Sequence, residues 1–157
     1  MSKSATLKRL YEAAKVGQAH GFYDRHSAAN ITYKYLIKTG DQPIILEIAE
    51  AGSEDTAATV TFTEAPTVTN AGTALSTYCM NRGSIGETTG VVLTETASGN
   101  TSAGTVEHTR TVTADVIDFC KDSPRILKAG TYYQIAITNP NAGPNDMEIR
   151  LAWTEQT

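Results

Sequence analysis

Apolar and polar side chains alternate strictly in two segments near the end of the chain, residues 126–139 and 147–155. Successive side chains of a strand leave opposite faces, so each segment has one apolar side. That side is formed by Tyr133, Ile135 and Ile137 in the first segment, and by Met147, Ile149, Leu151 and Trp153 in the second. The turn-forming stretch 139–146 between them is too long for a tight hairpin loop. Both segments are therefore expected to be half-buried strands of an antiparallel sheet.

Shorter alternating runs bounded by turn residues precede these segments, at the spacing of an all-β sandwich or barrel. They cover residues 31–38, 44–50, 59–63, 74–80, 90–96 and 105–113. With the closing segments they predict an all-β fold, an antiparallel and jelly-roll-like β-sandwich of about eight or nine strands. Ile44, Leu46 and Ile48 are expected to point inward and Glu47 and Glu50 outward. Phe62 and Trp153 are expected at the centre of the core.

The first thirty residues follow a different pattern and are expected to form an N-terminal arm, with the sandwich domain occupying residues 31–157. Leu7, Leu10, Tyr11 and Ala14 recur at helical spacing, and Ser4 and Gly17 are placed to begin and end a short helix. The stretch 18–30 has no period, which favours an ordered arm or loop. The helix either covers the sandwich or tethers the chain to another subunit.

Composition agrees with a single β domain, since 24 of the 157 residues are threonines, whose branched side chains favour strands. The net charge of −4 lacks the basic excess of general nucleic-acid binding, so no nucleic-acid partner is expected. No signal peptide and no apolar run of membrane-spanning length is visible, so we expect a protein made in the cytoplasm with no membrane partner. Cys79 and Cys120 are expected to be two reduced, packed thiols rather than a disulfide or a zinc site.

Candidate chemistry is sparse. The cluster His20, Asp24 and His26 has metal-ligand or acid–base residue types, but its spacing matches no zinc motif, so neither a metal nor another cofactor is expected. No nucleophile motif is present, and the run 83–86 lacks the lysine of a phosphate loop. Paired carboxylates of a glycosidase could come from any two strands, yet Glu47, Glu50, Glu64 and Glu107 are more simply solvated residues. We expect no enzyme and no catalytic residues.

Several runs together resemble a family of small structural proteins of tailed bacteriophages, the head decoration or cement proteins. The runs are residues 62–67, 70–73, 80–84, 126–133, 138–139 and 149–155, in the same order over about residues 30 to 155. The resemblance implies a non-enzymatic β-sandwich on the outside of a phage capsid, where it binds the major capsid protein and stabilises the shell. It also implies a homo-oligomer, for which a trimer is favoured because threefold sites suit trimers. Residues 1–17 have no counterpart in the family.

Large side chains that could contact another subunit are the interface candidates: Leu7, Leu10, Tyr11, Phe22, Tyr23, Arg25 and Tyr132. An alternative function is a tail-associated or receptor-binding module that recognises host-surface carbohydrate. Tyr132 is the candidate for both functions, because it shares the polar side of its strand with Gln134 and Thr138. Five tyrosines could form a sugar platform or an interface, namely Tyr11, Tyr23, Tyr78, Tyr132 and Tyr133.

Overall fold

A computed structural model describes residues 3–16, 18–80, 89–96 and 104–155. Within these residues one helix accompanies ten strands, and every strand pair is antiparallel. The elements are α1 (Lys3–Lys15), β1 (Ala19–Ala28), β2 (Ile31–Lys38), β3 (Ile44–Glu64), β4 (Thr73–Ala74), β5 (Tyr78–Cys79), β6 (Val92–Thr96), β7 (Thr105–Asp118), β8 (Arg125–Leu127), β9 (Tyr132–Asn139) and β10 (Asn145–Glu155). The expected all-β class is confirmed.

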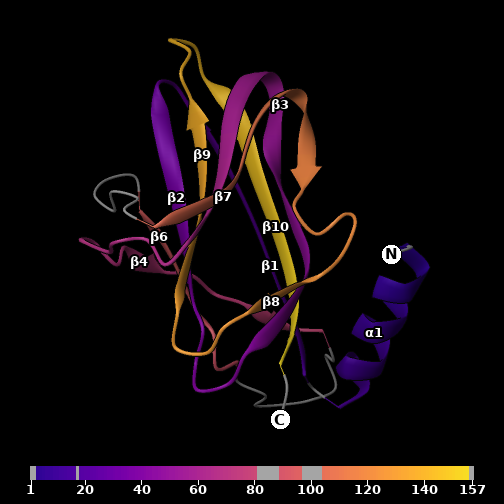
Figure 1. The fold of residues 1–157 in the computed structure, drawn as a ribbon. Coiled ribbons are helices and arrows are strands. Elements are labelled where there is room, and N and C mark those ends of the chain that lie inside the picture. Colours follow the sequence, from indigo (N-terminus) through magenta and orange to yellow (C-terminus); the bar gives the residue numbers. More distant parts are fainter. Residues whose placement is uncertain (1–2, 17, 81–88, 97–103, 156–157) are drawn as a thin grey trace.

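One long strand, β3, gives the sheet its curled, sandwich-like shape (Figure 1). Its first half, residues 44–53, pairs with β10, which continues through β1 to β5 as the first layer. Its second half pairs with β9 over residues 59–64, and β9 continues through β2 and β6 to β4 as the second layer. The expected strands at 44–50 and 59–63 are thus one strand, with an exposed middle at residues 54–56.

The core lies between the two layers and contains the apolar sides that alternation predicted. Trp153, Ile149 and Leu151 of β10 are buried there, together with Tyr133 and Phe62. The two closing strands do not pair with each other, because each pairs with a different half of β3. The alternation therefore identified the correct inward faces, and Phe62 and Trp153 are confirmed as core residues.

A register shift in β3 overturns one expected inward face. Leu46 pairs with Trp153 and Ile48 pairs with Ala152, so Glu47 is the extra residue of a bulge. After the bulge the core side passes from Ile44 and Leu46 to Ala49 and Ala51. Ile48 instead packs toward α1, and Glu47 is buried rather than solvated. The inward position expected for Ile48 was wrong because the bulge reverses the alternation. Glu47 lies on the outer side, as expected, but it is buried there beside Arg9 of α1.

The expected arm at residues 18–30 is also corrected. Ala19–Ala28 form β1, which pairs with β10 over ten residue pairs, so the boundary expected at residue 30 falls inside the sheet.

The short helix is present but begins at Lys3, which places Ser4 in its first turn rather than before it. The expected helix end at Gly17, the run 83–86 and most of the polar link 97–104 lie outside the described residues. No helix in the described part of the chain has the length and apolar character needed to cross a membrane.

Cys79 and Cys120 are thiols that form no disulfide, and Cys120 is the more deeply buried of the two. The thiol of Cys120 donates a hydrogen bond to the Leu46 carbonyl at 3.2 Å. Burial raises the pKa of Cys120 to about 12, with a further increase from Asp118. Only the thiolate reacts with disulfide reagents, so Cys120 is expected to be unreactive in the folded protein.

Labelling with a disulfide reagent at pH 8 is expected to modify Cys79 in the folded chain and both cysteines after unfolding in guanidinium. A thiol with a pKa of about 12 is about 10⁻⁴ thiolate at pH 8, and its burial also blocks access. A Cys79→Ser variant serves as the control and should react only when unfolded. Rapid labelling of that folded variant would contradict the burial of Cys120.

Candidate functional site

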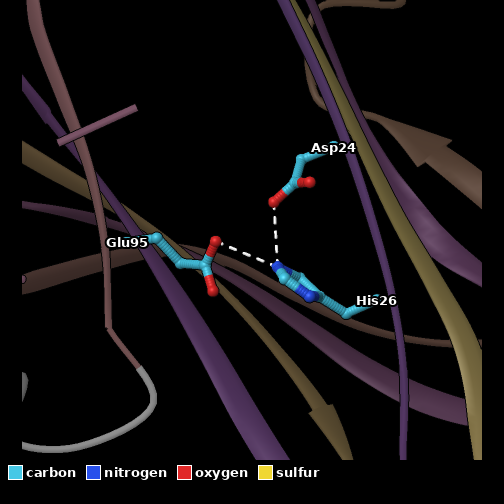
Figure 2. A group of neighbouring side chains, drawn as sticks. All are labelled: Asp24, His26 and Glu95. Carbon is cyan, nitrogen blue, oxygen red and sulfur yellow. Dashed lines mark hydrogen bonds and ion pairs between the residues drawn. The ribbon is translucent and has the colours of Figure 1, made fainter. Parts of the chain in front are cut away.

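Three side chains with metal-ligand chemistry meet where the two layers face each other (Figure 2). Asp24 and His26 are two residues apart on β1 and therefore share its inner face. Glu95 lies on β6, on the same face as the buried Leu93. His26 Nε2 lies 2.9 Å from Asp24 Oδ2 and 2.9 Å from Glu95 Oε2. The cluster thus bridges the first layer to the second.

Two tyrosines of β2 hold this cluster in place. The ring of Tyr33 stacks on His26, with centroids 4.1 Å apart and an interplanar angle of 9°. The hydroxyl of Tyr35 donates a hydrogen bond to Asp24 Oδ2 at 3.1 Å. Burial is the main cause that raises the pKa of Tyr35, so its hydroxyl remains a donor. Burial also raises the pKa of Glu95, which His26 opposes and Asp24 reinforces.

The histidine cluster considered from the sequence is only partly brought together. Asp24 and His26 meet, but His20 lies six residues before His26, about 20 Å along an extended strand. The His20 side chain is buried and stacks on Trp153 at a centroid distance of 5.9 Å. Glu95 was missed, because it is 69 residues from His26 and only the pairing of β6 with β2 places it there.

Large exposed side chains gather on the outer face of the first layer. The helix α1 packs on this face through Leu10, which contacts Ala19 of β1 and Ala152 of β10. Tyr78 of β5 lies over Gly21 on the same face, where an added Cβ would be 2.6 Å from its ring. We call these residues the exposed tyrosine face; they are Leu7 (62% exposed), Tyr11 (63%), Tyr23 (51%) and Tyr78 (47%).

The interface candidates from the sequence separate into three groups. Leu7, Tyr11 and Tyr23 belong to the exposed tyrosine face and remain candidates. Leu10 and Phe22 are corrected, because Leu10 is buried between α1 and the sheet and Phe22 lies in the core between the layers. Phe22 was misplaced because β1 was not recognised as a strand.

The two remaining candidates are engaged within the chain. Arg25 forms ion pairs with Glu54, at 2.9 Å, and with Asp146. Tyr132 is half-buried, and Lys38 lies over its ring with Nζ 5.4 Å from the centroid. Tyr133, considered for a sugar platform, is buried and accepts a hydrogen bond from the Lys128 amide at 2.8 Å. These contacts favour the exposed tyrosine face over Tyr132 as a binding surface.

A buried ion pair attaches α1 to the sheet. Glu47, the bulge residue of β3, accepts two hydrogen bonds from Arg9, from Nε at 2.9 Å and from Nη2 at 2.7 Å. The Glu47 side chain is fully buried, whereas the Arg9 side chain is 34% exposed. The bidentate pair therefore fixes the helix, and with it Leu7 and Tyr11, on the outer face.

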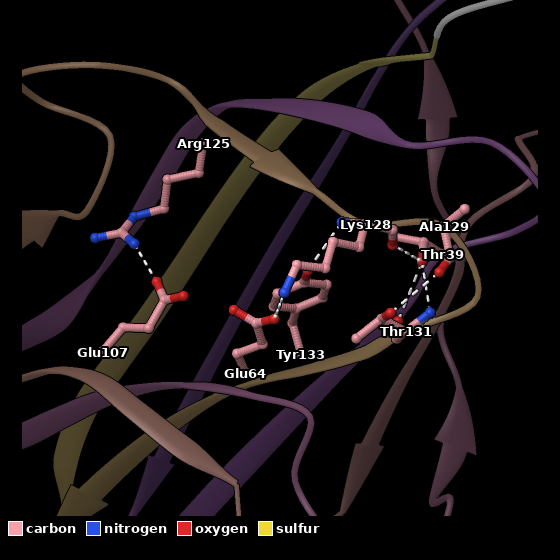
Figure 3. A network of polar contacts seen from close by, with 8 residues as sticks. All are labelled: Thr39, Glu64, Glu107, Arg125, Lys128, Ala129, Thr131 and Tyr133. Carbon is pink, nitrogen blue, oxygen red and sulfur yellow. Dashed lines mark hydrogen bonds and ion pairs between the residues drawn. The ribbon is translucent and has the colours of Figure 1, made fainter.

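A second pair of carboxylates, Glu64 and Glu107, has the residue types of glycosidase chemistry (Figure 3). Lys128 pairs with Glu64 and Arg125 pairs with Glu107. The hydrogen bond from Lys128 is the main cause that lowers the pKa of Glu64, and burial is the main cause that raises the pKa of Glu107. Each acid is thus engaged by its own cation, which favours a structural network over a catalytic pair.

Two features of the described structure can thus bind something outside the chain: the exposed tyrosine face and the cluster Asp24, His26 and Glu95. The first offers large amphipathic side chains for a protein surface, and the second offers one nitrogen and two oxygen ligands. Comparison of the chain with protein-family models, with curated proteins and with solved structures finds no match.

Proposed function

We propose that this protein is a non-enzymatic virion structural protein that binds the outside of a phage capsid and stabilises it. The observation that carries the proposal is the exposed tyrosine face. Monomeric proteins rarely expose several large apolar side chains on one face unless that face binds a partner. Tyrosine is also enriched at the centre of protein interfaces, because it adds apolar area and a hydrogen-bonding tip.

The partner that we propose is the major capsid protein. The residue runs that resemble head decoration proteins support this identity, and they include parts of β3, β9 and β10 that contribute to the core. A cement protein must resist outward pressure, so it needs a stiff body with contact surfaces on its outside. The proposal includes a homo-oligomer, with a trimer suited to threefold positions of the shell.

The binding test uses heads stripped of this protein. Purified wild-type protein is expected to rebind the heads and raise their resistance to heat. Tyr11→Ser and Tyr23→Ser are each expected to weaken binding by about tenfold or more, because interface tyrosines often contribute above 1 kcal/mol. Val92→Ser is the matched control, because Val92 is 52% exposed but lies on β6 of the second layer.

Three outcomes would contradict the proposal: no binding of wild-type protein to heads, binding that survives both tyrosine changes, or an equal loss with Val92→Ser. The alternative function, recognition of host carbohydrate, predicts a different result. The protein would then bind glycans, Tyr132→Ala would abolish this binding, and the wild-type protein would not bind heads.

A further inference from the structure

We propose that Asp24, His26 and Glu95 form a binding site for a first-row divalent cation such as Zn²⁺, which joins the two layers of the sandwich. The three donor atoms lie within 4.8 Å of one another, and the two nitrogen–oxygen distances are both 2.9 Å. Zinc bonds of about 2.0–2.2 Å place two ligands of one ion about 3 to 3.5 Å apart. A cation replacing the Nε2 proton therefore needs only a small adjustment of the side chains.

The charges of the cluster favour a cation. The ligand oxygens of Asp24 and Glu95 lie within 4.8 Å of each other, and both side chains are mostly removed from solvent, with exposed fractions of 26% and 16%. Two carboxylates this close repel each other. A divalent cation neutralises both and accepts the imidazole nitrogen as a third ligand.

The surrounding residues already orient the ligands. Tyr35 donates its hydrogen bond to the Asp24 carboxylate, and Tyr33 stacks on His26 and fixes the plane of its ring. Such supporting contacts around metal ligands maintain the geometry of the site. Ligands drawn from β1 and β6 and supported from β2 make this a cluster of three strands, unlike a chance group of surface acids.

The donor set identifies the class of ion. One imidazole nitrogen with two carboxylate oxygens suits Zn²⁺ or Mn²⁺, whereas Mg²⁺ and Ca²⁺ prefer oxygen ligands alone. Three protein ligands leave a fourth position for water, which the 29% exposure of the His26 side chain permits. In the ranges 3–16, 18–80, 89–96 and 104–155 no other group of three such side chains could hold a metal. Bound metal should therefore stabilise the closed sandwich through this site.

The test measures thermal unfolding and calorimetric binding of the full chain with ZnCl₂ alone, after treatment with a chelator. Zn²⁺ at about a hundred times its dissociation constant is expected to raise the Tm by about 5 to 10 °C, with a smaller rise for MgCl₂. His26→Gln and Glu95→Gln are expected to weaken Zn²⁺ binding by about 10- to 100-fold or more, because even supporting residues have effects of this size.

Two controls separate this site from other zinc ligands. His108→Gln changes a histidine of β7, and Cys79→Ser removes the half-buried thiol; both variants should bind Zn²⁺ like the wild type. Circular dichroism in chelator verifies the folding of each variant, and Asp24→Asn replaces any variant that does not fold. Absence of Zn²⁺ binding, or binding that the ligand variants leave unchanged, would overturn the proposal. The site is independent of capsid binding, so either proposal can fail alone.

Discussion

Replacing Trp153 by alanine is expected to lower the free energy of unfolding by about 3 to 5 kcal/mol, the typical cost of removing a large buried aromatic side chain. Trp153 is 2% exposed and pairs with Leu46 at the point where β3 carries its bulge. Its ring also stacks on the buried His20. The change would therefore leave a cavity beside two strands of the first layer.

Urea unfolding followed by far-ultraviolet circular dichroism measures this effect, since the variant lacks the single tryptophan needed for fluorescence. Ile126→Ala is the control, because Ile126 is a large apolar residue of β8 that is exposed to solvent. Its change should alter stability by less than about 0.5 kcal/mol. Equal effects of the two changes would contradict the assignment of Trp153 to the core.

Replacing Arg9 by methionine has the second large effect: it is expected to lower the free energy of unfolding by about 2 to 3 kcal/mol. The change leaves the carboxylate of Glu47 buried and without its bidentate partner, and breaking a buried pair in this way costs about 3 to 5 kcal/mol. The loss expected here is smaller than that typical cost because the Arg9 side chain is 34% exposed, which lets water reach the site. Urea unfolding measures the loss, and proteolysis of residues 3–15 should become faster because α1 is no longer attached.

The double variant Arg9→Met with Glu47→Met is the control for this prediction. Removing both partners leaves no unpaired charge, so most of the lost stability is expected to return. A single variant as stable as the wild type would contradict the role of the ion pair. A double variant as unstable as the single one would show that packing, rather than charge, attaches the helix.

Alternation predicted the fold best where both conditions of a half-buried strand hold: apolar residues face the core and no bulge interrupts the strand. β9 and β10 meet these conditions, and their inward faces were predicted correctly. β3 and β7 do not, since Glu47 and Glu107 are each the extra residue of a register shift. A bulge reverses the inward side without a signal in the residue pattern, so the inward position expected for Ile48 was wrong. Glu107 is exposed, as expected.

β1 was missed for a different reason. Its inner face carries His20, Phe22, Asp24 and His26, so most residues that point inward are polar. Periodicity recognises a strand only when the buried side is apolar. The same polar inner face is what creates the cluster with Glu95, whose position depends on the pairing of β6 with β2. From the sequence, therefore, only Asp24 and His26 of the site could be predicted, and Glu95 could not.

The binding surface was predicted in part because exposure cannot be read from residue type. Leu7 and Leu10 are neighbouring leucines on one side of α1, yet Leu7 is 62% exposed and Leu10 is 6% exposed. Tyr78 was considered as one of five tyrosines, but its place beside Tyr23 depends on the pairing of β5 with β1. Long-range pairing therefore determines which side chains share the exposed tyrosine face.

A density map of capsids to which the purified protein has been added tests the proposed function most directly. We predict density for this chain on the outer surface of the shell, with Leu7, Tyr11, Tyr23 and Tyr78 against the major capsid protein. Density with these residues facing solvent would contradict the proposed contact surface. Shells that carry no density for the chain would contradict the proposed function itself.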